Sequence, residues 1–206
     1  MSTTPYELVG RSRQKLRTRG ALIAAARELI AQGRSPTVDD AAAAAAVSRT
    51  TAYRYFPNQA QLLAAAHPET EARSMLPRTA PKDPAARLGA VVTRLTRIIL
   101  ETEPQQRTML RLSLEPDHRG HLLLRQGRAI KWIEEALAPL RDRLGPARLR
   151  RLVFAIRTTV GIEALVWLTD VAGVSREEAA KLMRWSASAL LRGALAANEK
   201  QRESSR

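Results

Sequence analysis

Six consecutive alanines, residues 41–46, lie between two residues that are typical helix N-caps, Thr37 and Ser48. Alanine has the highest helix propensity, and its small side chain lets a neighbouring helix approach closely. Asp40 stands three residues after Thr37 and completes a capping-box pattern, and its carboxylate also complements the helix dipole. The segment therefore predicts two short helices in close contact, joined by a tight turn.

Helical spacing of apolar residues continues along the chain and predicts an all-α protein. Four short helices are expected within residues 18–66, the first ending at Gly33 and the fourth capped by Asn58. A proline-punctuated linker follows up to residue 84, including Pro68. Longer helices are then expected at about 85–101, 104–114, 119–143, 147–171 and 176–198, with Ser175 and Glu178 as a capping box for the last.

The distribution of charge and of helix-breaking residues divides the chain into three parts. Residues 1–17 are predicted to form a flexible basic arm, because Arg11, Arg13, Lys15 and Arg17 alternate with other residues before the first apolar stripe. Residues 18–66 are predicted to form the N-terminal domain, and residues 67–206 a larger helical domain.

The net charge points to an anionic partner. The 206 residues include 34 Lys+Arg and 20 Asp+Glu, which gives a formal net charge of +14. This balance favours nucleic acid. The chain has no Cys, which excludes disulfides, thiolate zinc sites and cysteine nucleophiles and suits a reducing, cytoplasmic compartment. No apolar run approaches the roughly 20 residues of a membrane span.

Catalytic and metal-binding patterns are weak. The chain shows no nucleophile motif, glycine-rich phosphate loop or paired catalytic carboxylates, so we expect no enzyme and no cofactor. Glu115, Asp117, His118 and His121 have metal-ligating side chains. They surround a turn at residues 116–120, where polar residues accumulate without a chemical role, and we therefore expect no metal.

Residues 38–45, a turn at residues 46–48 and residues 49–56 have the layout of a helix-turn-helix, which places its second helix in the DNA major groove. On that second helix, Arg49 and Arg54 can contact guanine, and the Tyr53 hydroxyl can reach a phosphate. The alternative for these residues is a solvated surface, with the Tyr53 ring partly in the core.

At these residues the sequence resembles the TetR family of bacterial transcriptional repressors. The stretch Ala-Val-Ser-Arg-Thr-Thr-Ala-Tyr-Arg-Tyr-Phe-Pro-Asn, residues 46–58, resembles its turn and third helix, and residues 18–30, 37–42 and 61–63 resemble its first, second and fourth helices. Three positions differ, since this family commonly has Gly, His and Lys where Ala46, Tyr55 and Gln59 stand. Ala46 fits the turn if its φ stays negative. The candidate DNA-binding residues are Thr37, Ser48, Arg49, Thr50, Thr51, Tyr53, Arg54, Tyr55 and Gln59.

The resemblance implies a homodimer, formed as a four-helix bundle from the last two helices of each subunit. Apolar residues on several sides of these helices suit either this two-fold interface or burial inside one subunit. The candidate dimerisation residues are Val160, Trp167, Met183, Ala187, Leu190, Gly193 and Ala194. A pocket for a small-molecule effector is predicted between the helices of residues 85–143, lined by Leu95, Ile99, Met109, Leu112, Leu123 and Trp132.

These observations predict an all-α regulator with an N-terminal helix-turn-helix domain and a C-terminal helical effector and dimerisation domain. The expected function is a repressor that a small molecule releases from a palindromic operator. The alternative is an architectural DNA-binding protein without an effector, and a metal-binding or enzymatic helical module is the third interpretation.

Overall fold

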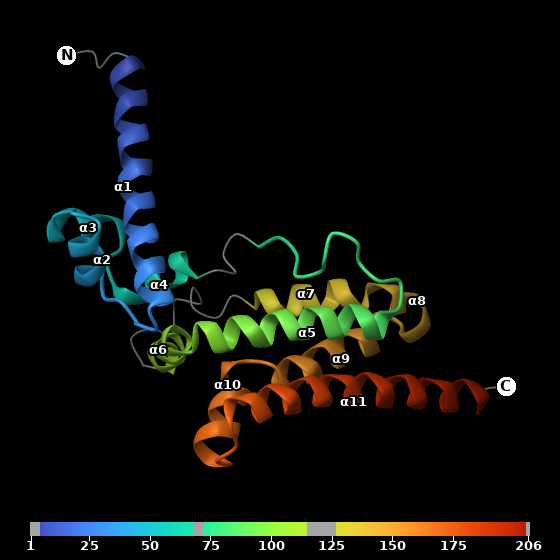
Figure 1. The fold of residues 1–206 in the computed structure, drawn as a ribbon. Helices are drawn as coiled ribbons and strands as arrows, with labels where there is room; N and C mark the ends of the chain where they lie inside the picture. Colours follow the sequence, from blue (N-terminus) through green and yellow to red (C-terminus); the bar gives the residue numbers. More distant parts are fainter. Residues whose placement is uncertain (1–4, 68–71, 115–126, 205–206) are drawn as a thin grey trace. The chain divides into compact units, whose positions relative to one another are not determined.

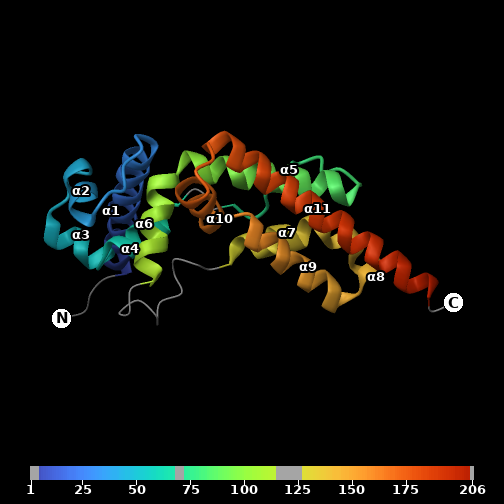
Figure 2. The same ribbon diagram turned by 90° about the horizontal axis from the view of Figure 1, so that it is seen from below.

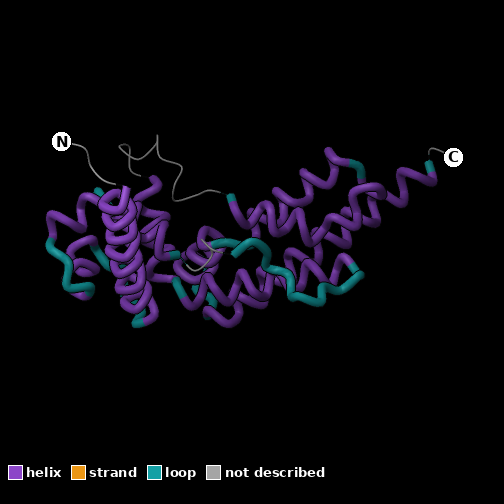
Figure 3. Tube along the Cα trace, turned by 90° about the horizontal axis from the view of Figure 1, so that it is seen from above, coloured by secondary structure: helices purple, strands orange, loops and turns teal. Residues whose placement is uncertain are grey.

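The computed structural model describes residues 5–67, 72–114 and 127–204, and within these ranges its regular structure is entirely helical (Figure 3). The prediction of an all-α fold is confirmed. The helices pack into two compact units, of which unit 1 contains α1–α4 and α6, and unit 2 contains α5 and α7–α11. The predicted boundary at residue 67 therefore differs from the packing, because α6 returns to the N-terminal unit.

Unit 1 is built on a small apolar core. Ala41 and Ala42 of the alanine run are buried, as expected for helices in close contact. The core also contains Leu22, Ala26, Ile30, Val38, Ala52, Phe56, Leu62, Leu63 and Ala66. Helix α1 packs on α2 and α4, α2 on α3, and α4 on α6. The bounds of these elements are α1 (Pro5–Ala31), α2 (Val38–Ala44), α3 (Arg49–Tyr55), α4 (Gln59–Ala66) and α6 (Glu103–Leu114).

The N-terminal segment differs from the predicted arm, because α1 already begins at Pro5. Among residues 12–31 of α1, whose side chains are described, Leu22 is the first that is buried, whereas Leu16 is 71% exposed. Arg, Lys, Gln and Leu are all good helix formers, so alternating charge is compatible with a helix even without a core beneath it. Figure 1 shows this part of α1 extending beyond α2 and α3.

Unit 2 is a bundle in which α5 packs on α7 and α11, and α9 packs on the same two helices (Figure 2). Its interior includes Leu88 and Val91 of α5 and Ile133 of α7, which are buried. The bounds are α5 (Pro84–Glu101), α7 (Arg128–Leu137), η4 (Ala138–Leu140), α8 (Arg141–Leu144), α9 (Pro146–Thr159), α10 (Ile162–Val166), η5 (Trp167–Val171) and α11 (Arg176–Glu203).

Two predicted long helices are divided. The helix expected at 119–143 is described only from α7 onward, and His118, His121 and Leu123 lie outside the described residues, as does Pro68. The helix expected at 147–171 breaks at Val160, whose backbone is extended, and Gly161. The Arg157 guanidinium occupies the space above Gly161, where an added Cβ would clash with its Nη1, and it donates to the Val160 carbonyl over 3.1 Å.

The last helix is confirmed, since the Ser175 side chain accepts from the Glu178 N–H over 3.1 Å at the start of α11. It continues to Glu203, past the predicted end at residue 198. Within the described ranges, no one helix has the length and apolar character to cross a membrane, although the bent pair α9 with α10 and η5 meets that test by length and composition.

Candidate DNA-binding site

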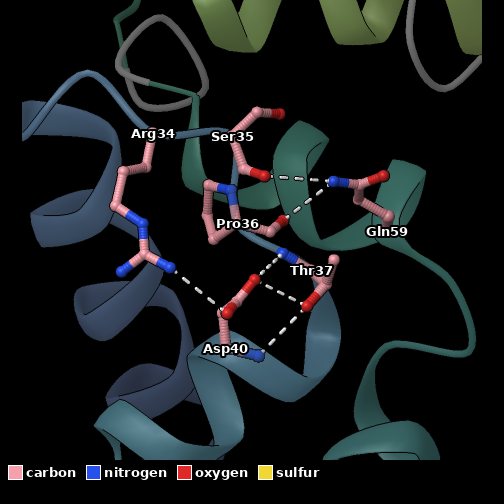
Figure 4. Close-up of polar contacts among 6 residues, drawn as sticks. All are labelled: Arg34, Ser35, Pro36, Thr37, Asp40 and Gln59. Atoms are coloured by element: carbon pink, nitrogen blue, oxygen red, sulfur yellow. Dashed lines mark hydrogen bonds and ion pairs between the residues drawn. The ribbon is translucent and has the colours of Figure 1, made fainter.

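The start of α2 is fixed by a capping box. The Thr37 Oγ1 accepts from the Asp40 N–H over 3.1 Å, and the Thr37 N–H donates to Asp40 Oδ2 over 2.9 Å. Arg34 Nη2 pairs with the other carboxylate oxygen at 3.3 Å (Figure 4). The backbone N–H of Thr37 and then its hydroxyl lower the pKa of Asp40, because both donate to the charged form. The predicted capping box is confirmed, and it holds the Thr37 side chain at the helix end.

Gln59 joins α4 to the segment before α2. Its Nε2 donates to the carbonyls of Ser35 and Pro36 over 3.3 and 3.2 Å (Figure 4). These bonds satisfy two backbone acceptors where the chain turns into α2. The amide of the predicted DNA contact Gln59 thus has a structural role within the domain.

The turn between α2 and α3 closes in a left-handed residue, Ala46, with φ +52°. The Ala46 N–H donates to the Ala43 carbonyl over 3.2 Å and the Val47 N–H to the Ala42 carbonyl over 2.9 Å, the two bonds of a Schellman motif. The expectation of a negative φ at Ala46 is wrong. A right-handed residue there would not allow the Val47 N–H to reach back to Ala42, so the turn imposes the conformation that glycine adopts most easily.

Helix α3 has one anchored face and one exposed face. The Ser48 Oγ accepts from the Thr51 N–H over 3.3 Å and donates to the Thr51 hydroxyl over 2.9 Å, which confirms the predicted N-cap. Ala52 and Phe56 are buried, and Tyr55 packs against the same core. Figure 1 shows α3 at the outer side of the domain, beyond α2. The exposed residues of α3 are Arg49, Thr50, Tyr53 and Arg54.

Arg49 is held by a carboxylate on α2. Its Nε donates to Asp39 Oδ1 over 2.9 Å and its Nη2 to Asp39 Oδ2 over 2.5 Å. Asp39 is the main cause of a raised pKa at Arg49, and Tyr53 contributes less. The sequence analysis missed this pair. Its signal was a complementary charge ten positions earlier, which becomes a contact only because the turn folds α3 back onto the start of α2.

The remaining predicted sites are distributed over the two units. Leu95 and Ile99 of α5 and Trp132 of α7 are buried in unit 2. Met109 packs on the core of unit 1, and Leu112 is buried on α6 of the same unit. The predicted effector-pocket residues are thus not gathered in one unit.

A groove opens between α9 and α11 on the surface of unit 2, with a volume of about 740 Å³. Leu190, Gly193 and Ala194, three predicted dimerisation residues, line it together with Leu152, Ala155 and Trp185. Trp185 is 64% exposed. By contrast, Val160, Met183 and Ala187 are buried inside the subunit, which corrects their assignment to a surface between subunits. Trp167 is exposed on η5.

The capped helix, left-handed turn and second capped helix, with a basic outer face on α3, define a DNA-binding protein of the helix-turn-helix class. Residues 22–66 match the family described as bacterial regulatory proteins, tetR family. They form a TetR-family N-terminal DNA-binding domain, and the chain is a DNA-binding transcriptional regulator. No curated protein matches the chain in a sequence comparison.

Proposed function

We propose that this regulator is a repressor that binds a two-fold symmetric operator as a homodimer and is released by a small molecule. The observation that carries the proposal is the exposed face of α3, which presents Arg49, Thr50 and Arg54 to solvent while Ala52 of the same helix is buried. Arginine pairs with guanine and threonine meets the thymine methyl, so this face can read bases. In a dimer, two such helices face successive major grooves.

The α9–α11 groove supports the homodimer. It is open and largely apolar, with the exposed Trp185 beside Gly193 and Ala194. Small residues next to a large aromatic make a surface that is complementary to a second copy turned by 180°, since each Trp185 can pack over the small residues of the other subunit. A second copy of this chain is therefore the occupant that we assign to the groove.

For the effector we propose the interior of unit 2. Leu95, Ile99 and Trp132 are apolar and lie on α5 and α7, which pack against each other. A compound that separates these side chains binds one arrangement of the bundle better than another. Its differential affinity for the two arrangements sets how far it lowers DNA affinity.

Selection from a pool of random-sequence duplex DNA tests the function. The full chain should enrich two inverted half-sites whose centres lie about 34–36 Å apart, one helical turn, or a multiple of it. Binding to the enriched duplex should then exceed binding to the starting pool by about 10³-fold or more at a fixed salt concentration. Equal binding to both would contradict the proposal and favour an architectural DNA-binding protein.

A further inference from the structure

Asp39 and Arg49 form a two-bond ion pair on the outer side of the helix-turn-helix. Asp39 belongs to the first turn of α2, and Arg49 is the first residue of α3. The Arg49 side chain remains 75% exposed and that of Asp39 38% exposed. The pair thus presents an arginine to solvent in a held orientation instead of covering it.

The pair occupies only one edge of the guanidinium. Arginine has five N–H donors, and the contact with Asp39 uses the Nε–H and one Nη2–H. The end of the group, with Nη1 and the second Nη2–H, is the edge with which arginine makes its two-bond contact to O6 and N7 of guanine. Asp39 and a guanine can therefore engage Arg49 together.

Stability does not account well for this arrangement, because exposed ion pairs contribute little to folding. Affinity does not account for it either, since a carboxylate beside a DNA-binding face repels the phosphates. The orientation of the Arg49 side chain does account for the pair. A free arginine must give up rotamer freedom when it binds, and a side chain that is already held gives up less.

We propose that Asp39 is a positioning residue that holds Arg49 for the recognition of one guanine in each half-site. The inference rests on the DNA-binding role of α3 proposed above. It adds a residue on α2 that touches no base and nevertheless sharpens base preference.

The test is selection from the random duplex pool with four full-length proteins: the parent, Asp39→Asn, Arg49→Ala and the double variant. Arg49→Ala should abolish the preference for guanine at one position of each half-site. Asp39→Asn should reduce the preference at that same position about two- to tenfold, the range that ordering one long side chain is worth. The double variant should select like Arg49→Ala. Affinity of Asp39→Asn for the unselected pool should stay equal or rise, because a negative charge is removed.

Glu28→Gln is the matched control, since Glu28 is exposed on α1 of the same unit and its replacement removes the same charge. It should leave every base preference unchanged. Circular dichroism melting verifies that all variants fold. Asp39→Asn selecting the parental site with equal or greater sharpness would overturn the inference, as would an equal reduction of preference at all positions. A parent that enriches no sequence would contradict the proposed function instead.

Discussion

At the scale of single residues, α1 and α2 end with the same pair of backbone hydrogen bonds. The left-handed residue is a glycine after α1 and an alanine after α2. After α1, the Gly33 N–H donates to Ile30 and the Arg34 N–H to Leu29, with φ +76° at Gly33. After α2, Ala46 takes the corresponding position at φ +52°. The left-handed region costs an L-residue roughly 1–2 kcal/mol, whereas glycine enters it without penalty. The turn of the DNA-binding motif is therefore less stable with Ala46 than it would be with glycine in the same backbone conformation.

Ala46→Gly should stabilise this turn by about 1 kcal/mol, because the backbone is already in a conformation that glycine prefers. Amide hydrogen exchange in peptides covering residues 38–56 measures the local free energy of opening. Gly33→Ala is the matched control and should destabilise its turn by a similar amount. A Cβ at Gly33 meets no atom within 4 Å, so only the penalty for the positive φ remains. Exchange that is no slower in the turn or the flanking helices of Ala46→Gly would contradict the assigned strain.

At the scale of elements, the sequence predicts the helices whose ends depend on local contacts. Thr37, Ser48 and Asn58 each cap a helix through the N–H group three residues later, so α2, α3 and α4 could be located from the sequence. The break between α9 and α10 could not, because Arg157 reaches Glu163 and Val160 only once the chain has bent.

In the candidate site, too, features set by local spacing could be predicted and features set by distant partners could not. The outward face of α3 follows from helical spacing, with Ala52 buried and Tyr53 exposed. The roles of Gln59 and Asp39 depend on partners 24 and 10 positions away. Such contacts require the angle between two helices, which a single sequence does not supply. The sequence therefore assigns Gln59 to DNA, whereas the structure uses its amide to position two elements.

The N-terminal extension of α1 makes a prediction at this scale. Arg13, Lys15 and Arg17 are exposed on it, and we expect them to contact phosphates. Replacing all three by Gln keeps good helix formers and removes three charges. The slope of log affinity against log salt should become shallower by up to about 0.9 for each phosphate interaction that is removed, with base preference unchanged.

Gel-shift titrations of the selected duplex at several salt concentrations measure this slope. The charge-matched control replaces Arg73, Arg78 and Lys82, which are exposed in unit 2, by Gln. If both triple variants give the parental slope, α1 makes no phosphate contact. If both slopes fall equally, the effect belongs to net charge and not to α1.

At the scale of the whole molecule, the two units are interleaved along the chain. Helix α5 belongs to unit 2, and the following α6 belongs to unit 1. Gln105 of α6 is fully buried and donates to the Leu63 carbonyl near the end of α4 over 2.9 Å. A fragment that ends at residue 67 would lack this donor and would expose the side of α4 that α6 covers. The DNA-binding unit is therefore completed by a helix that lies after part of unit 2 in the sequence.

The homodimer prediction also belongs to this scale. Gly193→Glu places a charged side chain in the α9–α11 groove, and a Cβ at Gly193 meets no atom of its own subunit within 4 Å. The subunit should therefore fold normally, with a slightly more favourable α11 because glycine is a poor helix former. A bulky side chain at this position overpacks the interface in both copies, at typically about 1–3 kcal/mol each. The variant should therefore be monomeric and should bind the selected two-fold duplex far more weakly.

Sedimentation velocity distinguishes monomer from dimer at the same protein concentration. Gly89→Glu is the matched control, because Gly89 is exposed within α5 and a Cβ added there also meets no atom within 4 Å. It adds the same charge to a helix of the same unit away from the groove, so it should remain dimeric and bind the duplex like the parent. A dimeric Gly193→Glu protein would place the interface on another surface. A monomeric parent that still binds one half-site tightly would show that α3 recognises DNA without a second copy.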